Sequence, residues 1–218
     1  MIVEELVALY RNRTQDSKAP FLWSDDEVLE YIDDAQNEAC RRAHLLIDSR
    51  SDICVATITL GDPVVEIDPR IIHIRRARRV SDSMPLVRRS VRDMDQMCPG
   101  SDGQTSRSTP SVFIPDWEVG VLRVYPVPVI ADEVLMTVVR MPLKAITDND
   151  SKLEIQPQYH RGLLDWMLYR GYSKADPETR DETKAKASEK NFIAAFGERI
   201  NAADEHWAFE NYQDVGEV

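Results

Sequence analysis

The chain has 218 residues, 43% of them hydrophobic, so it can bury a core and belongs to a globular protein of one large or two small domains. Its net charge of −11 argues against a protein whose main role is to hold nucleic acid, because Lys and Arg supply most of the affinity for phosphates. Three widely spaced cysteines favour free thiols in a reducing cytoplasm over a disulfide framework. Neither a secretory signal nor an apolar run of the ~20 residues needed to span a membrane is expected.

Apolar residues at helical spacing predict a helix over the first ten residues, and a polar linker follows it. The stretch WSDDEV then predicts the start of a second helix. Ser24 would be its N-cap, Glu27 would complete a capping box, and Trp23 would pack against Val28 as a hydrophobic staple. Apolar residues at spacings of three and four extend this amphipathic helix to near Asp48.

From residue 54 the apolar spacing changes to alternate residues, which is typical of strands. The predicted strands are rich in β-branched residues and separated by turn formers: CVATITL, VVEI, IIHIRRARRV, SVFIPDW, VLRVYPVP and EVLMTVVRMP. A short helix is predicted at SVRDMDQM, and PGSDGQTSRSTPS is predicted to be a loop. Pro126 and Pro128 cannot donate ladder hydrogen bonds, so they should end their strand or lie at a sheet edge.

Helical patterns return after residue 150. Pro157 suits a first helical turn, and Asp176, Pro177 and Glu178 predict the start of a further helix. This order predicts an α+β fold in which N- and C-terminal helices form one helical module, 1–50 with 151–205, and an antiparallel β region is inserted at 51–150. Residues 206–218 remain as a C-terminal tail.

No catalytic motif stands out in the sequence. Gly-rich phosphate loops, nucleophile elbows and zinc-protease motifs are absent, and the histidines fall on four different predicted elements. The acidic pairs of the second helix are explained by the preference of a helix N-terminus for negative charge. We therefore expect no catalytic residue, no metal site and no cofactor.

Arginines are concentrated between positions 70 and 92, where Asp82 is the only acid. If IIHIRRARRV is a strand, Arg76 and Arg78 face one side and Arg75 and Arg79 the other, so neither side beyond Ile74 can be ordinary core. Three interpretations stay open. The arginines could lie in water, contact DNA phosphates, or pair with the acidic part of an identical neighbour.

Three aromatic residues, Trp207, Phe209 and Tyr212, lie in the acidic tail. Their burial would contribute on the order of 10–15 kcal/mol, at ~150–250 Å² per ring and ~25 cal/mol per Å². Ordering roughly ten residues at about 1–2 kcal/mol each nearly cancels that gain. A single tail should therefore bind weakly, whereas a ring that presents many tails should bind firmly. Trp207 alone could instead finish the apolar stripe of the last helix.

The chain resembles the head-to-tail connector (adaptor) proteins of tailed bacteriophages, which include the tail tubular protein beneath the portal of short-tailed phages. The resemblance rests on LWSDDEVLEYIDDAQNEACRRAHLL, on VLRVYPVPVIADEVLMTVVRMPL, and on IQPQYHRGLLDWMLYRGYSKADPETRDETKAKASEKNFIAAFGERI. These segments span most of the chain, although none is a diagnostic motif. The segment from Arg70 to Arg92 matches no pattern of that family.

The resemblance implies a virion structural protein in the neck, assembled in the host cytoplasm, that is not an enzyme and contacts no membrane. It implies a homo-oligomeric ring, expected to be a dodecamer, that joins the portal protein to a tail or nozzle protein. DNA would pass through its channel without specific binding.

The aromatic residues Trp207, Phe209 and Tyr212 would dock on the portal. Because a basic lumen would grip DNA, we expect a basic patch at subunit contacts or facing the tail; its members are Arg75, Arg76, Arg78, Arg79, Arg88, Arg89 and Arg92. The alternative is a DNA-binding assembly or regulatory protein that uses the segment from Arg70 to Arg92. A hydrolase is the least favoured reading.

Overall fold

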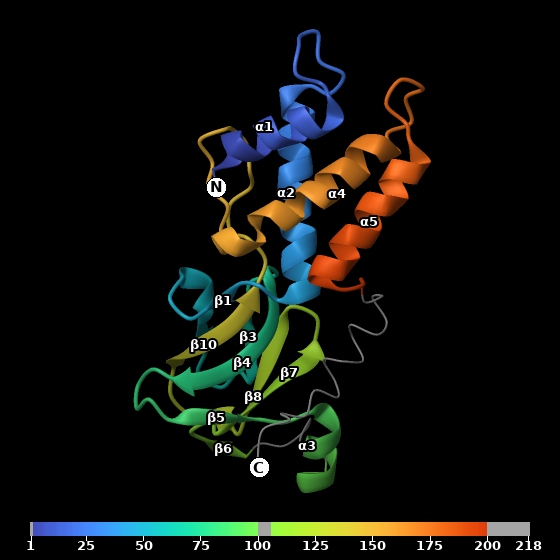
Figure 1. Cartoon of the computed structure of the whole chain (residues 1–218). Coiled ribbons are helices and arrows are strands. Elements are labelled where there is room, and N and C mark those ends of the chain that lie inside the picture. Colours follow the sequence, from blue (N-terminus) through green and yellow to red (C-terminus); the bar gives the residue numbers. More distant parts are fainter. Residues whose placement is uncertain (1, 100–105, 200–218) are drawn as a thin grey trace. The chain divides into compact units, whose positions relative to one another are not determined.

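A computed structural model of the protein describes residues 2–99 and 106–199 (Figure 1). These residues fall into two compact units, a helical unit of residues 2–46 and 141–199 and a β unit of residues 47–99 and 106–140. The described residues contain five α-helices and a large, mostly antiparallel sheet, which confirms the predicted α+β fold.

The helical unit contains both ends of the described chain. Its elements are α1 (Val3–Thr14), α2 (Asp25–Ala43), the short 3₁₀ turn η2 (Pro157–Tyr159), α4 (His160–Ser173) and α5 (Glu182–Phe196). The predicted capping box at the start of α2 is confirmed, since the Glu27 amide donates to Ser24 Oγ (3.2 Å) and the Ser24 amide donates to Glu27 Oε2 (3.0 Å).

Two predicted helix boundaries are wrong. Helix α2 ends at Ala43, five residues before Asp48, because His44 adopts a left-handed conformation (φ 51°) and Asp48 pairs with Val138 in a strand. Helix α5 begins at Glu182 rather than next to Asp176. Asp176 caps a single turn by accepting from the Glu178 amide, and Asp181 is the N-cap that accepts from Lys184.

Aromatic rings contact one another within the core of the helical unit. The rings of Tyr10 and Trp23 meet edge to face at 5.6 Å, and Trp23 Nε1 donates to the carbonyl oxygen of Gly171 on α4. Helices α4 and α5 pack through Trp166 and Phe192, whose ring centroids are 4.8 Å apart. Trp166 Nε1 also donates to Asp34 of α2 (2.8 Å), so the indole contacts both α2 and α5.

The β unit begins with strand β1, and strand β10 pairs with three other strands, β1, β2 and β4. Its elements are β1 (Ile47–Asp48), the 3₁₀ turn η1 (Asp52–Cys54), β2 (Val55–Ile58), β3 (Val64–Glu66), β4 (Ile71–Arg79), β5 (Pro85–Arg88), α3 (Val91–Met97), β6 (Arg107–Ser108), β7 (Val112–Glu118), β8 (Val121–Tyr125), β9 (Val127–Pro128) and β10 (Asp132–Arg140). The strand order is β1-β10-β4-β5-β7-β8-β3, and β2 pairs with the same edge of β10 as β1.

Strand β2 also contacts β3, the strand at the far end of the order, which shows that the sheet curls. Its strand pairs are antiparallel except for β5 with β7, and β6 and β9 form a separate two-stranded parallel sheet, so the β region is mostly but not purely antiparallel. The concave side holds the core, which includes Ile58, Phe113, Leu122, Val134 and Met136. The short helix predicted at SVRDMDQM is confirmed as α3.

Candidate interaction surfaces

Strand β4 carries a bulge in the middle of its arginine run. Thr137 of β10 pairs with Arg76 and Val138 pairs with Ile74, so Arg75 is an extra residue without a partner across the ladder. The extra residue shifts the alternation, which lets both Ile74 and Ala77 point into the core. The expectation that neither side of the strand beyond Ile74 could be core is therefore wrong.

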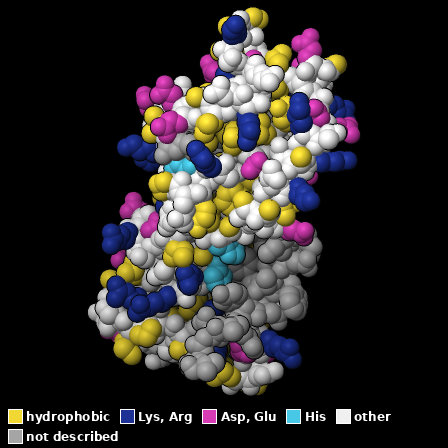
Figure 2. Space-filling model, viewed as in Figure 1, with side chains coloured by type: hydrophobic (Ala, Val, Ile, Leu, Met, Phe, Trp, Pro, Cys, Tyr) yellow, Lys and Arg dark blue, Asp and Glu magenta, His cyan; other side chains and the backbone are white. Residues whose placement is uncertain are grey.

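The bulge leaves three arginines of β4 on the outside of the unit. Arg75 and Arg76 are exposed and Arg78 is half-buried. Among the described residues, none of the three guanidinium groups has a hydrogen-bond or ion-pair partner. Figure 2 shows basic side chains beside apolar ones over the hairpin formed by β4 and β5.

Arg79 differs from these three, because its side chain is only 9% exposed and binds within the same subunit. Its guanidinium pairs with Asp82 of the following turn and donates to the carbonyl oxygen of Pro110 (2.7 Å). Asp82 is also a backbone cap, accepting from the Met84 amide, and this bond together with the Arg79 guanidinium lowers the pKa of Asp82. Arg79 is therefore a structural residue of the hairpin and is not available to a partner.

The remaining predicted arginines do not lie on β4. Arg88, at the end of β5, is half-buried and its Nη1 lies 3.4 Å from His73 Nε2. Arg89 follows that strand, and Arg92 is exposed on α3. The fold thus brings Arg75, Arg76 and Arg78 together on one strand, whereas Arg88, Arg89 and Arg92 lie between the end of β5 and the start of α3.

The outer face of the sheet around these arginines is partly aliphatic. Leu135 pairs with Arg78 on one side and with Val55 on the other, and alternation places Val87 of β5 on the same face as Pro85, the partner of Arg78. Val55 is 41% exposed and Val87 is 49% exposed. We call Val55, Arg75, Arg76, Arg78, Val87 and Leu135 the outer sheet face.

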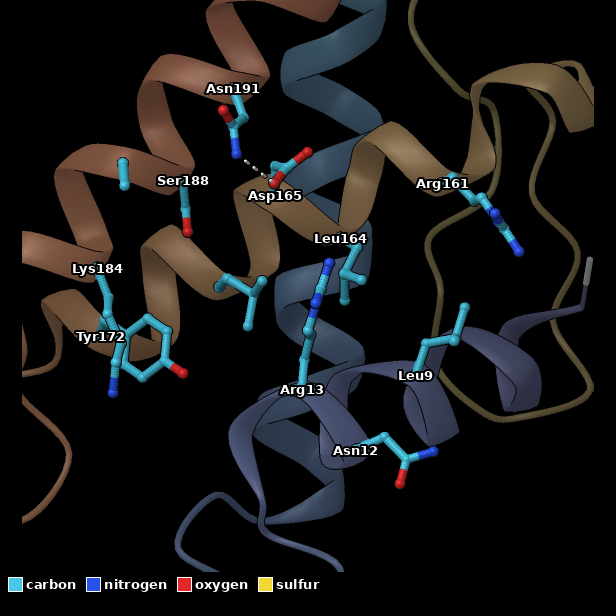
Figure 3. A pocket seen from close by; sticks show the side chains of 12 residues that line it. Leu9, Asn12, Arg13, Arg161, Leu164, Asp165, Tyr172, Lys184, Ser188 and Asn191 are labelled. Atoms are coloured by element: carbon cyan, nitrogen blue, oxygen red, sulfur yellow. Dashed lines mark hydrogen bonds between the residues drawn. The ribbon is translucent and has the colours of Figure 1, made fainter.

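The second candidate surface is a groove in the helical unit. No pattern in the sequence predicted it. It has a volume of about 790 Å³ and lies between α1, α4 and α5 (Figure 3). Its apolar lining comes from five side chains: Leu9, Leu164, Leu168, Tyr172 and Ala187. Its charged lining comes from Arg13, Arg161, Lys184 and Asp165, so three cations face one acid.

The acid in the groove, Asp165, is half-buried and its neighbour Asn191 donates to it at 3.4 Å. Burial raises the pKa of Asp165, which the Asn191 amide and the Arg13 charge only partly offset. Arg13 and Arg161 have no hydrogen-bond or ion-pair partner within the part of the chain that the structure describes. Figure 3 places Arg161 at the opposite end of the groove from Tyr172 and Lys184.

The end of α5 is held by Arg42 of α2. The Arg42 side chain is 5% exposed, its guanidinium lies 5.0 Å from the Trp166 ring and 5.1 Å from the Phe192 ring, and it pairs with Glu38. It also donates to the carbonyl oxygen of Gly197 (3.2 Å), the C-cap residue of α5. Arg42 thereby links α2 to the residue at which α5 ends.

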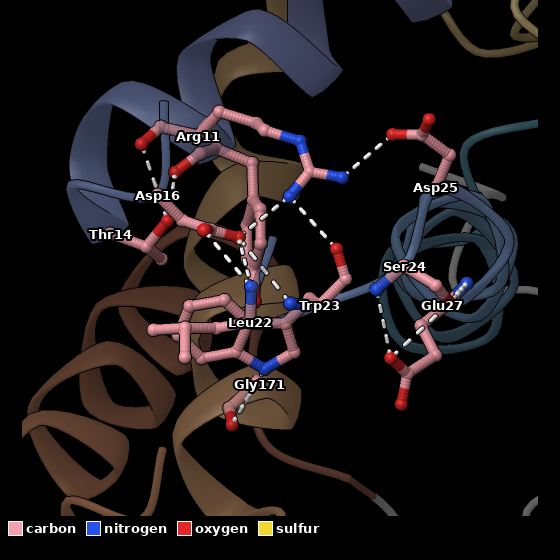
Figure 4. Close-up of polar contacts among 10 residues, drawn as sticks. Arg11, Thr14, Asp16, Leu22, Trp23, Ser24, Asp25, Glu27 and Gly171 are labelled. Carbon is pink, nitrogen blue, oxygen red and sulfur yellow. Dashed lines mark hydrogen bonds and ion pairs between the residues drawn. The ribbon is translucent and has the colours of Figure 1, made fainter. Parts of the chain in front are cut away.

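The linker before α2 is organised by a buried ion pair (Figure 4). Arg11 Nη1 donates to Asp16 Oδ2 (2.7 Å) and to the carbonyl oxygen of Trp23 (2.9 Å), and Arg11 Nη2 donates to Asp25 (2.6 Å). Asp16 also accepts from the Leu22 and Trp23 amides. These bonds make the linker part of the packed unit, where the sequence indicated only polar residues.

The predicted portal-docking residues Trp207, Phe209 and Tyr212 lie outside the described residues. Among the residues that are described, no group of three or more His, Cys, Asp or Glu side chains is placed to bind a metal ion. Within the same ranges, no helix is both long and apolar enough to cross a membrane.

Comparison with known proteins gives a family. The profile of the SU10 adaptor protein family matches residues 1–214. No curated protein matches the chain. Because the family match covers nearly the whole sequence, the chain belongs to the SU10 adaptor protein family.

Proposed function

We propose that this adaptor forms a homo-oligomeric ring, a dodecamer, that joins the portal to the tail and leaves a channel for DNA. Membership of a phage adaptor family already places the protein among structural, non-enzymatic components of the virion neck that associate with head and tail proteins. The similarity to the tail tubular protein of short-tailed phages remains a prediction. So does assembly in the host cytoplasm.

The observation that carries the ring is the outer sheet face. Arg75, Arg76 and Arg78 have no acidic partner among the described residues and lie beside exposed valines. Arginine is enriched among the residues that contribute most to protein interfaces, and a basic face needs an acidic partner. Copies of this chain, at a net charge of −11, are such a partner. A basic face on one copy that meets an acidic face on the next can close into a ring.

The tail docks on the portal in this proposal. Trp207, Phe209 and Tyr212 supply the apolar area, and a ring supplies many tails, so weak single contacts become firm attachment. The β unit faces the tail or nozzle protein, with Arg88, Arg89 and Arg92 at subunit contacts or on that side. The channel is not basic, so DNA passes without being held.

The test of the ring is mass photometry and electron microscopy of the purified protein with and without portal. We expect rings with portal for the wild type and their loss for Arg76→Glu/Arg78→Glu. The control Arg50→Glu/Lys186→Glu makes the same charge change at two exposed residues away from the outer sheet face and should still form rings. Equal assembly by both variants would exclude the outer sheet face as the subunit contact.

The docking role of the tail has its own test. Trp207→Ala/Phe209→Ala/Tyr212→Ala should weaken portal binding in a pull-down at least tenfold, because it removes most of the apolar area of the segment. Wild-type binding by this variant would show that the tail is not the portal contact.

The second candidate is a DNA-binding assembly or regulatory protein, which Arg75, Arg76 and Arg78 also favour, since they have no ion-pair partner among the described residues. That function predicts duplex DNA binding that falls steeply with salt and is lost in Arg75→Ala/Arg76→Ala/Arg78→Ala. Arg79 is left out of this variant because it is bound within the hairpin. DNA binding by a monomer that ignores portal would replace the adaptor ring as our conclusion.

A further inference from the structure

We propose that, in the unassembled subunit, the segment 200–218 docks in the groove between α1, α4 and α5 of its own chain. This goes beyond the proposed ring and portal contacts, because it concerns the subunit before any partner is present. The residues that line the groove and the residues of the segment are complementary in charge and in apolar character.

The charges of the segment and of the groove are opposite in sign. Asp204, Glu205, Glu210, Asp214 and Glu217 give the segment five acids, and it contains no Lys or Arg. The groove presents Arg13, Arg161 and Lys184 against Asp165 alone. Lys184 already contacts Asp181 (3.2 Å), whereas Arg13 and Arg161 have no ion-pair partner among the described residues. These two arginines are therefore the cations best placed to receive acidic residues.

The apolar surfaces match as well. Leu9, Leu164 and Tyr172 are only partly buried, so the floor of the groove still exposes apolar area. The segment brings Trp207, Phe209 and Tyr212. Aromatic rings placed on this floor would be removed from water without entering the core, which is complete without them.

The position of the groove favours the chain's own segment over that of a neighbour. Helices α4 and α5 are antiparallel, since Tyr172 lies near Lys184 at one end and Gly162 touches the Phe196 ring at the other. The chain therefore leaves α5 near the start of α4, which is the end of the groove that holds Arg161. A tethered segment has an effective concentration in the mM range, which compensates for the weak binding of one tail.

Docking of this kind would keep three aromatic rings covered until the portal competes for them. The subunit would stay soluble and unassembled alone, and release of the segment would be coupled to arrival at the portal. The same residues would thus serve two surfaces in succession, the groove first and the portal second.

The experiment is ¹⁹F NMR of the full chain labelled with 5-fluorotryptophan, without portal. The chain has four Trp residues, and Trp207→Phe assigns the resonance of Trp207. We expect this resonance to differ from that of a synthetic peptide of residues 200–218. It should move to the peptide position in Arg13→Glu/Arg161→Glu. The control Lys186→Glu/Lys190→Glu changes the same charge on α5 outside the groove lining and should leave it in place.

The resonances of Trp23 and Trp166, which are buried in the core of the helical unit, report whether each variant is folded. If Arg13→Glu/Arg161→Glu disturbs the Trp23 and Trp166 resonances, charge neutralisation replaces charge reversal. Arg13→Gln/Arg161→Gln is then compared with Lys186→Gln/Lys190→Gln as control. A wild-type Trp207 resonance at the peptide position would overturn the proposal. An equal shift in both pairs would also overturn it, and a shift that depends on protein concentration would assign the segment to a neighbouring copy instead.

Because no portal is present, this experiment is independent of the ring and portal assays. A subunit that docks its segment but fails to bind portal would refute the adaptor proposal and leave the groove proposal standing. A subunit with a free segment that still forms rings on portal would sink the groove proposal alone.

Discussion

Replacing Arg11 by methionine should destabilise the helical unit by about 3–5 kcal/mol, because removal of one partner leaves a buried carboxylate without its counter-charge. The side chain of Asp16 is 3% exposed and that of Arg11 is 9% exposed, so water cannot replace the lost ion pair. Asp16 would retain only its bonds from the Leu22 and Trp23 amides. Methionine keeps the length and the apolar stem of Arg11, so the loss reports the charge rather than a cavity.

The other partner of Arg11 provides a matched comparison. Asp25 also binds the guanidinium, at 2.6 Å, but its side chain is 65% exposed. Asp25→Asn should therefore cost about 0–1 kcal/mol, the usual contribution of an exposed ion pair. We expect Arg11→Met to cost well above Asp25→Asn, because Arg11 binds the buried Asp16 and the Trp23 carbonyl oxygen as well as the exposed Asp25.

Urea unfolding followed by circular dichroism at the helix band measures these differences. The long helices α1, α2, α4 and α5 all belong to the helical unit, so the signal reports that unit. At a slope of about 2 kcal/mol per M, Arg11→Met should lower the midpoint by roughly 2 M. If Asp25→Asn lowered the urea midpoint as much, or if Arg11→Met left the midpoint unchanged, burial would not explain the contribution of the Arg11–Asp16 ion pair to stability.

Three further results are expected. Gly171→Ala should destabilise the protein despite the ~1 kcal/mol helix preference of Ala, because the added Cβ would lie 2.0 Å from the Tyr10 hydroxyl oxygen. Tyr10→Phe should then restore part of the loss in thermal unfolding, since that hydroxyl is buried and has no hydrogen-bond partner among the described residues. In the β unit, burial alone would raise the pKa of Asp48, but bonds from the Arg50 amide, from Ser51 and from Arg140 Nε lower it. The Asp48 carboxylate therefore stabilises the folded protein at pH values above 3.8, the ordinary pKa of Asp. This stabilisation is lost as the pH falls below that value. Unfolding followed at several pH values should show Asp48→Asn destabilising at neutral pH and converging with the wild type in acid. Burial raises the pKa of Asp165, which means that the folded protein disfavours the charged carboxylate. Asp165→Asn should therefore leave stability at neutral pH unchanged or raise it by up to about 1 kcal/mol. A clear loss of stability in calorimetry would contradict this expectation.

Local signals in the sequence were sufficient for much of this architecture. The capping box of Ser24 and Glu27 joins residues three apart, so its bonds need no other part of the chain. The change from helical to alternate spacing near residue 54 likewise reflects the periods of helix and strand. Family membership was also within reach of the sequence, since the resemblance to phage adaptors drew on segments that span most of it.

Tertiary contacts decided what lies between distant segments. Both Asp176 and Asp181 are suitable N-caps, and the packing of the turn between them, where Thr179 is buried, selects the second. The bulge at Arg75 depends on the register with β10, which is more than fifty positions away in the chain. The spacing of residues within β4 contains no sign of it.

The same reason explains the candidate surfaces. That Arg79 belongs to its own hairpin while Arg78 faces outward follows from strand pairing, which sets the side of every residue at once. The groove unites side chains from α1, α4 and α5, so no stretch of sequence contains it. Charge, composition and local helix signals are thus properties of the sequence itself, whereas the partners of each arginine exist only after long-range packing has brought the strands and helices together.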